Sequence, residues 1–284
     1  MGKSSKMDDV NDACKKSNGS NPYEKLLQEY DKEIEKNQED PAAWVKRGLA
    51  LSKLERFEEA VLAFEKALQK NQDDPAVWFS KGVALGSAGR HEEAVEAFGK
   101  ALEINPDDYY IWFNKGVALG STGRYEEAIK AFDKTLEHEP GDPFALLNKG
   151  IALGELGRNE EAVQFYEKAA EIFPDNPSIW VNKGVALGSL GRSEDALQDF
   201  EKALQLRPNE PSAWINKGVI LGEMGRYDEA LQAYEKAMEF DPENPSAWIN
   251  KGVALDELGR HEDAVQAYEK AKELNPYIGE RDWN

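Results

Sequence analysis

The sequence is poor in cysteine, histidine and positive charge. A single cysteine, Cys14, excludes an intramolecular disulfide and any metal cluster built on cysteine. This cysteine usage fits a reducing compartment, and we predict a cytoplasmic protein. The three histidines, His91, His138 and His261, fall in separate parts of the chain and are interpreted as packing residues. The sequence therefore predicts no metal site and no other cofactor.

Long hydrophobic runs are also missing. No stretch approaches the ~20 apolar residues that span a bilayer, and the N-terminal segment contains no apolar core of signal-peptide length. Acidic residues outnumber basic ones by 54 to 35, which gives a net charge of −19. That charge repels phosphate backbones and anionic lipid head groups. It disfavours nucleic acid and membranes as partners.

Motifs of catalysis are absent as well. The recurring spacing Gly-x-x-x-Gly-x-x-Gly matches neither the dinucleotide fingerprint nor the phosphate loop. The acidic pairs are separated by long stretches of sequence, which argues against the paired carboxylates of a glycosidase. No serine or cysteine has a context typical of a nucleophile, and we predict that the chain is not an enzyme.

What the sequence does contain is a period of 34 residues. Six of the seven tryptophans keep its register, with Leu146 in the remaining place, at Trp44, Trp78, Trp112, Trp180, Trp214 and Trp248. Such a period indicates stacked supersecondary units. Seven full units are predicted, over residues 41–74, 75–108, 109–142, 143–176, 177–210, 211–244 and 245–278.

Each unit is predicted to contain two helices, so the fold class is all-α. Proline opens the first helix of most units, as at Pro177, where its missing N–H does no harm. A Gly-Arg pair such as Gly191-Arg192 ends that helix, because glycine adopts the left-handed turn that a helix end requires. The second helix opens with paired acids, which suit the positive end of the helix dipole.

The segments outside these units are assigned by comparison within the chain. Residues 24–40 align without a gap with residues 58–74. Residues 21–40 are therefore predicted to form a capping helix that covers the first unit. Residues 1–20 are predicted to be a disordered polar tail, and residues 279–284 a C-terminal tail.

These offsets resemble the tetratricopeptide repeat. Unit 211–244 shows the pattern in full, with Trp214, Gly218, Leu221, Tyr227, Ala230, Tyr234, Ala237 and Pro242. The resemblance implies a right-handed α-solenoid superhelix of antiparallel helix pairs, whose first helices line a concave groove. Members of the family mostly bind other proteins, as peptides or helices held in that groove. The chain departs from the family before the repeated glycine, where a basic residue such as Lys183 replaces leucine; we expect its ammonium at the rim or paired with an acid of a neighbouring outer helix.

One stripe of each first helix is predicted to face the groove. It is unusually apolar in unit 177–210, where Val181 either contributes to a binding surface or packs against the next unit. Asparagine recurs in the stripe at Asn114, Asn148, Asn182, Asn216 and Asn250. Its amide matches the backbone of an extended peptide, which it can bind without reading side chains. The alternative is that repeats of this family carry asparagine here whatever they bind.

Glycine recurs in the same stripe, at Gly86, Gly120, Gly154, Gly188 and Gly222. A glycine inside a helix costs about 1 kcal/mol relative to alanine, so its presence needs compensation. Two explanations stay open. Neighbouring helices pack against the bare backbone, or the groove floor is lowered at positions such as Gly154 and Gly188 for a closely applied ligand.

The two ends of the predicted groove differ in chemistry. Aromatic residues gather early, where they either anchor an apolar part of the ligand or pack between units, at Phe79, Tyr110, Phe113 and Phe144. Acidic residues gather late, at Glu155, Glu223, Asp256 and Glu257. They favour a ligand with basic residues toward that end.

Together these features predict a non-enzymatic adaptor whose groove binds an extended protein or peptide segment. Two alternatives stay open. The chain is a structural spacer or self-associating scaffold with an empty groove, or it is an accessory repeat domain of a larger protein.

Overall fold

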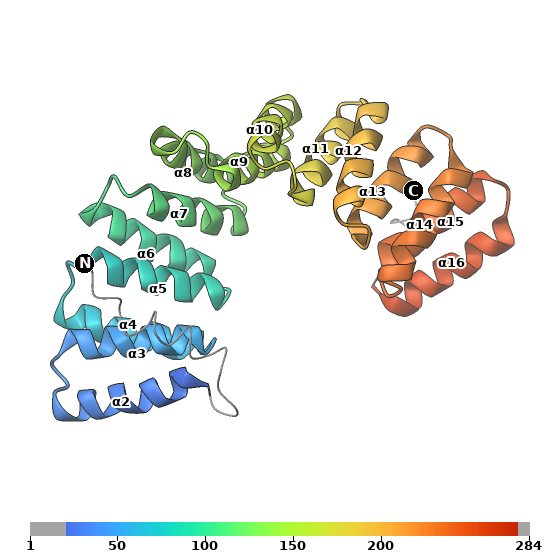
Figure 1. Cartoon of the computed structure of the whole chain (residues 1–284). Helices are drawn as coiled ribbons and strands as arrows, with labels where there is room; N and C mark the ends of the chain where they lie inside the picture. The colour runs from blue at the N-terminus through green and yellow to red at the C-terminus, as the bar shows by residue number, and fades with distance from the viewer. Residues whose placement is uncertain (1–20, 278–284) are drawn as a thin grey trace. The chain divides into compact units, whose positions relative to one another are not determined.

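The computed structural model describes residues 21–277, and within them it contains fifteen α-helices and no strand (Figure 1). The helices are α2 (Pro22–Lys36), α3 (Pro41–Lys53), α4 (Phe57–Lys70), α5 (Pro75–Ser87), α6 (His91–Ile104), α7 (Tyr109–Ser121), α8 (Tyr125–His138), α9 (Pro143–Glu155), α10 (Asn159–Ile172), α11 (Pro177–Ser189), α12 (Ser193–Leu206), α13 (Pro211–Glu223), α14 (Tyr227–Phe240), α15 (Pro245–Glu257) and α16 (His261–Leu274). The all-α prediction is confirmed. The predicted tails over 1–20 and 279–284 lie outside the described residues.

The chain divides into two compact units, one ending at Glu139 and the other beginning at Pro140. The first contains α2 to α8 and the second α9 to α16. One helix pair lies within each of the seven predicted repeats, and α2 lies within the predicted cap. Among residues 21–277, no helix is both long enough and apolar enough to cross a bilayer.

The first helix of a pair begins with a side-chain cap at all but one of its seven occurrences. In α11 the Asn176 side chain accepts a hydrogen bond from the Ser178 N–H, and aspartate or asparagine does the same before the other capped helices. Glu210 precedes α13 and makes no such bond. Each cap satisfies a backbone donor that the first turn would otherwise leave unpaired.

The turn inside each pair uses left-handed backbone, as the Gly-Arg pattern predicts. Gly191 has φ of 72°, and in the first pair Glu55 takes this conformation with φ of 59°. The arginine that follows the turn forms an ion pair with the first turn of the second helix. Arg192 Nη2 lies 2.6 Å from an Asp195 carboxylate oxygen, and the same i,i+3 ion pair recurs after the other turns. The second helices therefore begin without a side-chain cap but with an ion pair across the first turn.

The core of each pair depends on the first repeated glycine. A Cβ added to Gly184 would lie 2.7 Å from Phe200 Cε1, and an aromatic ring of the second helix occupies the same place in every pair. Gly184 therefore lets the two helices approach. Trp180, predicted on the same face, is only half-buried, because its indole extends to the preceding turn and donates a hydrogen bond to the Pro174 carbonyl at 2.7 Å.

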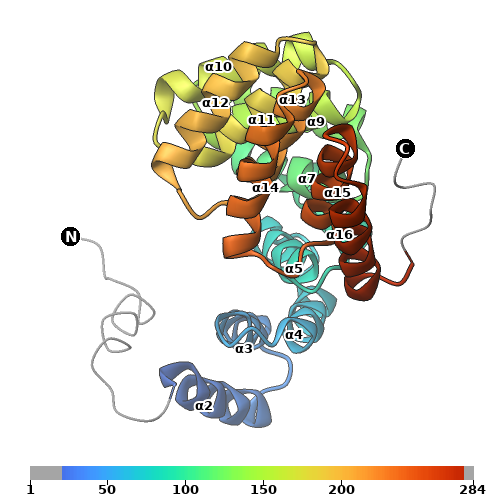
Figure 2. The same cartoon turned by 90° about the vertical axis from the view of Figure 1, so that its right-hand side faces the viewer.

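Helices stack in the same way inside both units. Consecutive helices are in contact throughout each unit, and first helices of successive pairs also touch (Figures 1 and 2). These contacts join α3 to α5 and α5 to α7 in the first unit, and α9 to α11, α11 to α13 and α13 to α15 in the second. The exposed side of the first helices therefore forms one continuous surface within each unit.

Candidate ligand-binding surface

We call the exposed side of α3, α5, α7, α9, α11, α13 and α15 the first-helix surface, taken separately in each unit. It carries the stripe that the sequence predicts to face a groove. In α11, Ser178, Val185 and Ser189 are exposed, while Asn182 and Gly188 are half-buried. Val181 is half-buried and packs against a cluster formed by Ala203, Leu204 and Ala213. That contact favours the packing interpretation of Val181.

The repeated asparagines are half-buried and lean along their own helices. The side-chain amides of Asn114, Asn148 and Asn182 each donate to a backbone carbonyl four residues earlier, at 2.8 Å. One N–H of each amide is thus used internally, and the carbonyl oxygen and second N–H stay available. Within the described part of the chain, the side chains of Asn216 and Asn250 make no hydrogen bond.

The second repeated glycine occupies two kinds of environment. A Cβ on Gly188 would lie 2.5 Å from Ile220 Cδ1, so the next first helix packs on that backbone. At Gly120 no atom lies within 4 Å, and at Gly154 the nearest atom is the Tyr166 hydroxyl at 3.8 Å. Packing therefore explains Gly188 but not Gly120 or Gly154, nor their counterparts Gly86 and Gly222.

These glycines also sit closer to a helix end than the sequence alone indicates. Each is the second-last residue of its helix; Gly154, for example, precedes the last residue of α9, Glu155. A glycine costs less in the last turn, where fewer helical bonds depend on it, so ~1 kcal/mol per glycine is an upper value.

The early aromatic residues all pack on other rings. In the first unit, Phe79 lies between Phe98 and Tyr110, with ring centroids 5.8 and 5.5 Å apart, and Phe113 lies 6.0 Å from Phe132. Packing thus accounts for Phe79 and Phe113. Tyr110 nevertheless keeps 57% of its surface exposed.

Phe144 belongs to the second unit, where it packs edge-on against Phe173 with centroids 6.1 Å apart. Half of its surface stays exposed. Because Phe144 is in a different compact unit from the other three aromatic residues, the anchor predicted from the sequence reduces to one exposed ring in each unit.

A cavity of 280 Å³ opens on the first-helix surface of the second unit, between α13 and α15. Its floor is α14, through Tyr227 and Tyr234, and Gly222 and Asn250 are among its walls. Two carboxylates, Glu223 and Glu257, also line it, and it has no basic lining residue. Tyr234 is only 3% exposed, and burial followed by the charge of Glu223 raises the pKa of its hydroxyl.

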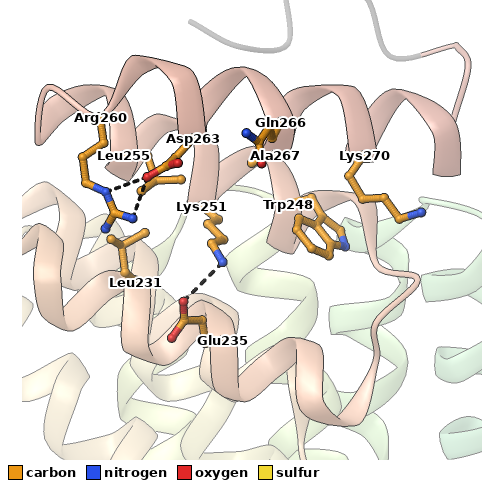
Figure 3. Close-up of a pocket in the computed structure, with 10 residues that line it drawn as sticks. All are labelled: Leu231, Glu235, Trp248, Lys251, Leu255, Arg260, Asp263, Gln266, Ala267 and Lys270. Atoms are coloured by element: carbon orange, nitrogen blue, oxygen red, sulfur yellow. Dashed lines mark hydrogen bonds and ion pairs between the residues drawn. The ribbon is translucent and has the colours of Figure 1, made fainter.

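A larger cavity, of 430 Å³, lies among α14, α15 and α16 on the other side of the helices (Figure 3). Its charges are already paired within the protein. Lys251 Nζ lies 3.2 Å from Glu235, and Arg260 binds Asp263 at 2.7 Å. We therefore regard it as a packing gap rather than the binding surface.

The basic residue before the repeated glycine forms such an ion pair in most repeats. Lys217 Nζ, for example, lies 2.9 Å from Glu201 of the preceding second helix, which confirms the pairing expected from the sequence. Lys115 departs from the pattern because Gly99 occupies the corresponding acidic position. Burial lowers the pKa of Lys115.

Lys183 also departs from the pattern. It pairs at 3.3 Å with Asp199 of its own second helix. Asp199 is buried where five of the other six repeats have alanine and one has Phe165, and one of its carboxylate oxygens makes no hydrogen bond. Burial raises the pKa of Asp199, with Lys183 opposing that shift.

Each helix pair contains a glycine packed under an aromatic ring. The sequence that forms these pairs matches a known family model. The model described as tetratricopeptide repeat matches residues 27–75, 45–109, 79–143, 113–177, 181–245 and 220–277. The chain belongs to the tetratricopeptide repeat family. A search of curated proteins found no match.

Solved structures of repeat proteins share this fold. A tetratricopeptide repeat protein from Parabacteroides merdae has a TM-score of 0.71 at 16% identity, covering 87% of this chain and 96% of that one. MamA has a TM-score of 0.53 at 24% identity, covering 59% and 92%. YrrB, whose structure is described as having an unusual peptide-binding site, has a TM-score of 0.52 at 29% identity, covering 64% and 94%.

Sequence reasoning missed the cavity between α13 and α15. Part of its signal was the alanine that the repeats carry at one place, as at Ala254 in α15, to which Ile220 in α13 is the exception. Ile220 covers Gly188, whereas Ala254 leaves Gly222 uncovered. Among residues 21–277, no three histidine, cysteine or acidic side chains are grouped so that they could hold a metal ion.

Proposed function

We propose that this tetratricopeptide repeat protein is a non-enzymatic cytoplasmic scaffold whose first-helix surface binds an extended segment of another protein. The observation that carries the proposal is uncovered backbone on helices that also carry available amides. No side chain covers Gly154 or Gly222, while Asn148 and Asn216 lie on the same helices with unused hydrogen-bonding groups. An extended peptide supplies the backbone groups that such amides bind.

The comparisons support the same class of function. YrrB, similar to this chain over most of its own length, is described as having a peptide-binding site. Exposed acidic residues on the second unit, such as Glu155 and Glu223, favour a segment that carries positive charge. Self-association is the competing function, and it would leave the first-helix surface empty.

The test uses peptides selected from a random library against the full chain. Affinity is measured by fluorescence anisotropy for the wild type and for the triple variant Asn148→Ala, Asn182→Ala and Asn216→Ala. The triple variant should bind roughly tenfold or more weakly, because each lost amide bond contributes about 0.5–1.5 kcal/mol.

The chain offers a matched control on the opposite helices. Gln164→Ala, Gln198→Ala and Gln232→Ala remove three exposed amides at the same period from α10, α12 and α14, and they should leave affinity unchanged. Equal binding by the asparagine triple variant would contradict the proposal. Failure to select any peptide, together with concentration-dependent light scattering, would favour the self-associating scaffold.

A further inference from the structure

The cavity between α13 and α15 has an alanine where the preceding site has an isoleucine. In α13, Ile220 reaches over Gly188 of α11 and fills the space above it. The residue at the same place in α15 is Ala254, and the nearest atom to a Cβ on Gly222 is then the Tyr234 hydroxyl, at 4.0 Å. The other repeats also have alanine at this place, so the site above Gly188 is the filled exception and the site above Gly222 is one of the open ones.

The floor of the open site above Gly222 is the hydroxyl of a buried tyrosine, Tyr234, which lines the cavity. Tyr234 exposes only 3% of its surface. Its hydroxyl makes no hydrogen bond within the described part of the chain. In the next repeat the equivalent hydroxyl, of Tyr268, donates to Asp256 at 3.0 Å. Asp256 stands where the earlier repeat has Gly222. The Tyr234 hydroxyl therefore lacks the protein partner that Asp256 provides to Tyr268, and it faces the cavity.

The charges around the cavity restrict what that group can be. Glu223 comes from α13 and Glu257 from α15, so the two carboxylates enter from both walls. Burial, followed by the charge of Glu257, raises the pKa of the Tyr227 hydroxyl. No lysine, arginine or histidine lines the cavity. An anion like the Asp256 carboxylate would be repelled here, whereas a cation finds two carboxylates and a phenol oxygen as acceptors.

The size of the cavity matches one side chain. Its volume of 280 Å³ lies below the ~300–1,000 Å³ of sites that enclose drug-sized ligands. The acceptors come from three helices, which suits the planar guanidinium with its five fixed donors better than the single compact ammonium of lysine. Guanidinium is also the more weakly hydrated of the two cations and enters a partly closed site more readily.

We propose that this cavity binds the guanidinium of an arginine carried by the segment on the first-helix surface, with Glu223, Glu257 and Tyr234 as its acceptors. The inference rests on the proposed function for its occupant, since the arginine belongs to the bound segment. It adds the chemical identity of one ligand residue and the place where that residue enters.

The first test uses a small probe and does not require the segment. N-acetyl-arginine amide is titrated into the full chain, and NMR follows the resonances of Gly222 and the Tyr234 ring. Saturable shifts are expected with the arginine probe and none with its neutral isostere, N-acetyl-citrulline amide. Equal shifts from both probes would overturn the role of charge. Equal or tighter binding of N-acetyl-lysine amide would overturn the choice of arginine.

Matched variants locate the effect. Ala254→Ile fills the cavity with the side chain that the protein already uses at Ile220, and it should abolish the shifts. Ala186→Ile makes the same change one repeat before Ile220, above Gly154, and should leave them intact. Glu223→Gln with Glu257→Gln keeps the shape and should weaken the probe roughly tenfold or more. Circular dichroism confirms that each variant is folded.

The selected peptides then separate the two proposals. The inference is overturned, with the proposed function intact, if peptides bind Ala254→Ile as tightly as the wild type or carry no arginine. The proposed function fails, with the cavity site intact, if the arginine probe shifts Gly222 and no peptide binds. Arginine-containing peptides that lose roughly tenfold affinity for Ala254→Ile, and none for Ala186→Ile, support both.

Discussion

Two sets of glycines, four residues apart on the same helices, should respond to alanine in opposite directions. Gly120 and Gly154 have room for a Cβ, with nothing nearer than the Tyr166 hydroxyl at 3.8 Å. Gly116 and Gly150 have none, because a Cβ would lie 2.6 Å from Phe132 Cε1 and 2.5 Å from Tyr166 Cε1. Gly120 and Gly154 are therefore uncovered, whereas Gly116 and Gly150 pack in the core.

The magnitudes follow from these distances. Gly120→Ala and Gly154→Ala remove backbone freedom from the unfolded chain and should each stabilise by about 0.4–1 kcal/mol. Together they should raise the melting temperature by roughly 2–8 °C, since ~1 kcal/mol corresponds to ~2–4 °C in a chain of this size. Gly116→Ala and Gly150→Ala force a rigid ring to move and should each destabilise by about 1–3 kcal/mol.

The assay is thermal and urea unfolding followed by far-ultraviolet circular dichroism. Repeat arrays lose two-state behaviour, so each double variant is compared with the wild type across the whole transition. A fall in stability for Gly120→Ala with Gly154→Ala, comparable with that of the core pair, would refute the reasoning. It would show that these glycines serve packing rather than the approach of a ligand.

Three further predictions concern single sites. Asp199→Ala should raise the free energy of unfolding by about 1–3 kcal/mol at neutral pH, because it removes a buried oxygen without a hydrogen bond and lets Lys183 pair with Glu167 instead. Since burial raises the pKa of Asp199, this gain should shrink as the pH falls to about 4. A variant less stable than the wild type at neutral pH would contradict this. Gly99→Glu should stabilise by about 1 kcal/mol through helix propensity and should raise the pKa of Lys115, measured by NMR titration; an unchanged pKa would show that no pair forms. Burial raises the pKa of Tyr268 from 10.0 to about 12. The stability that this tyrosine contributes below pH 10 should therefore be lost as the pH rises from about 10 to 12. Melting temperatures measured across that range should fall less for Tyr268→Phe than for the wild type.

Local features of the fold could be predicted from the sequence because they depend on neighbouring residues. Proline and a Gly-Arg pair place the ends of α11 at Pro177 and Ser189, since each acts on the backbone where it stands. The left-handed turn at Gly191 could be predicted from the Gly-Arg pair in the same way. Because the sequence repeats every 34 residues, the same local features recur in each repeat.

The remaining features depend on contacts between repeats, where small differences decide the outcome. The site above Gly188 is filled because Ile220 replaces the alanine that the other repeats have at this place, whereas Ala254 leaves the site above Gly222 open. The internal bonds of the asparagine amides depend on rotamers that the sequence leaves open. From the sequence, an aromatic residue such as Phe113 is equally compatible with anchoring a ligand and with packing between helices. The structure decides for packing because the Phe113 ring contacts Phe132.

The central claim is that the first-helix surface binds an extended segment, and intermolecular nuclear Overhauser effects test it most directly. Val185 and Val253 expose methyl groups on that surface, with 44% and 38% of their areas accessible, and Val265 exposes 54% on a second helix. A selected peptide bound to the full chain should give Overhauser effects to the methyls of Val185 and Val253 and none to Val265. Effects confined to Val265 would contradict the account and place the ligand on the opposite side of the helices.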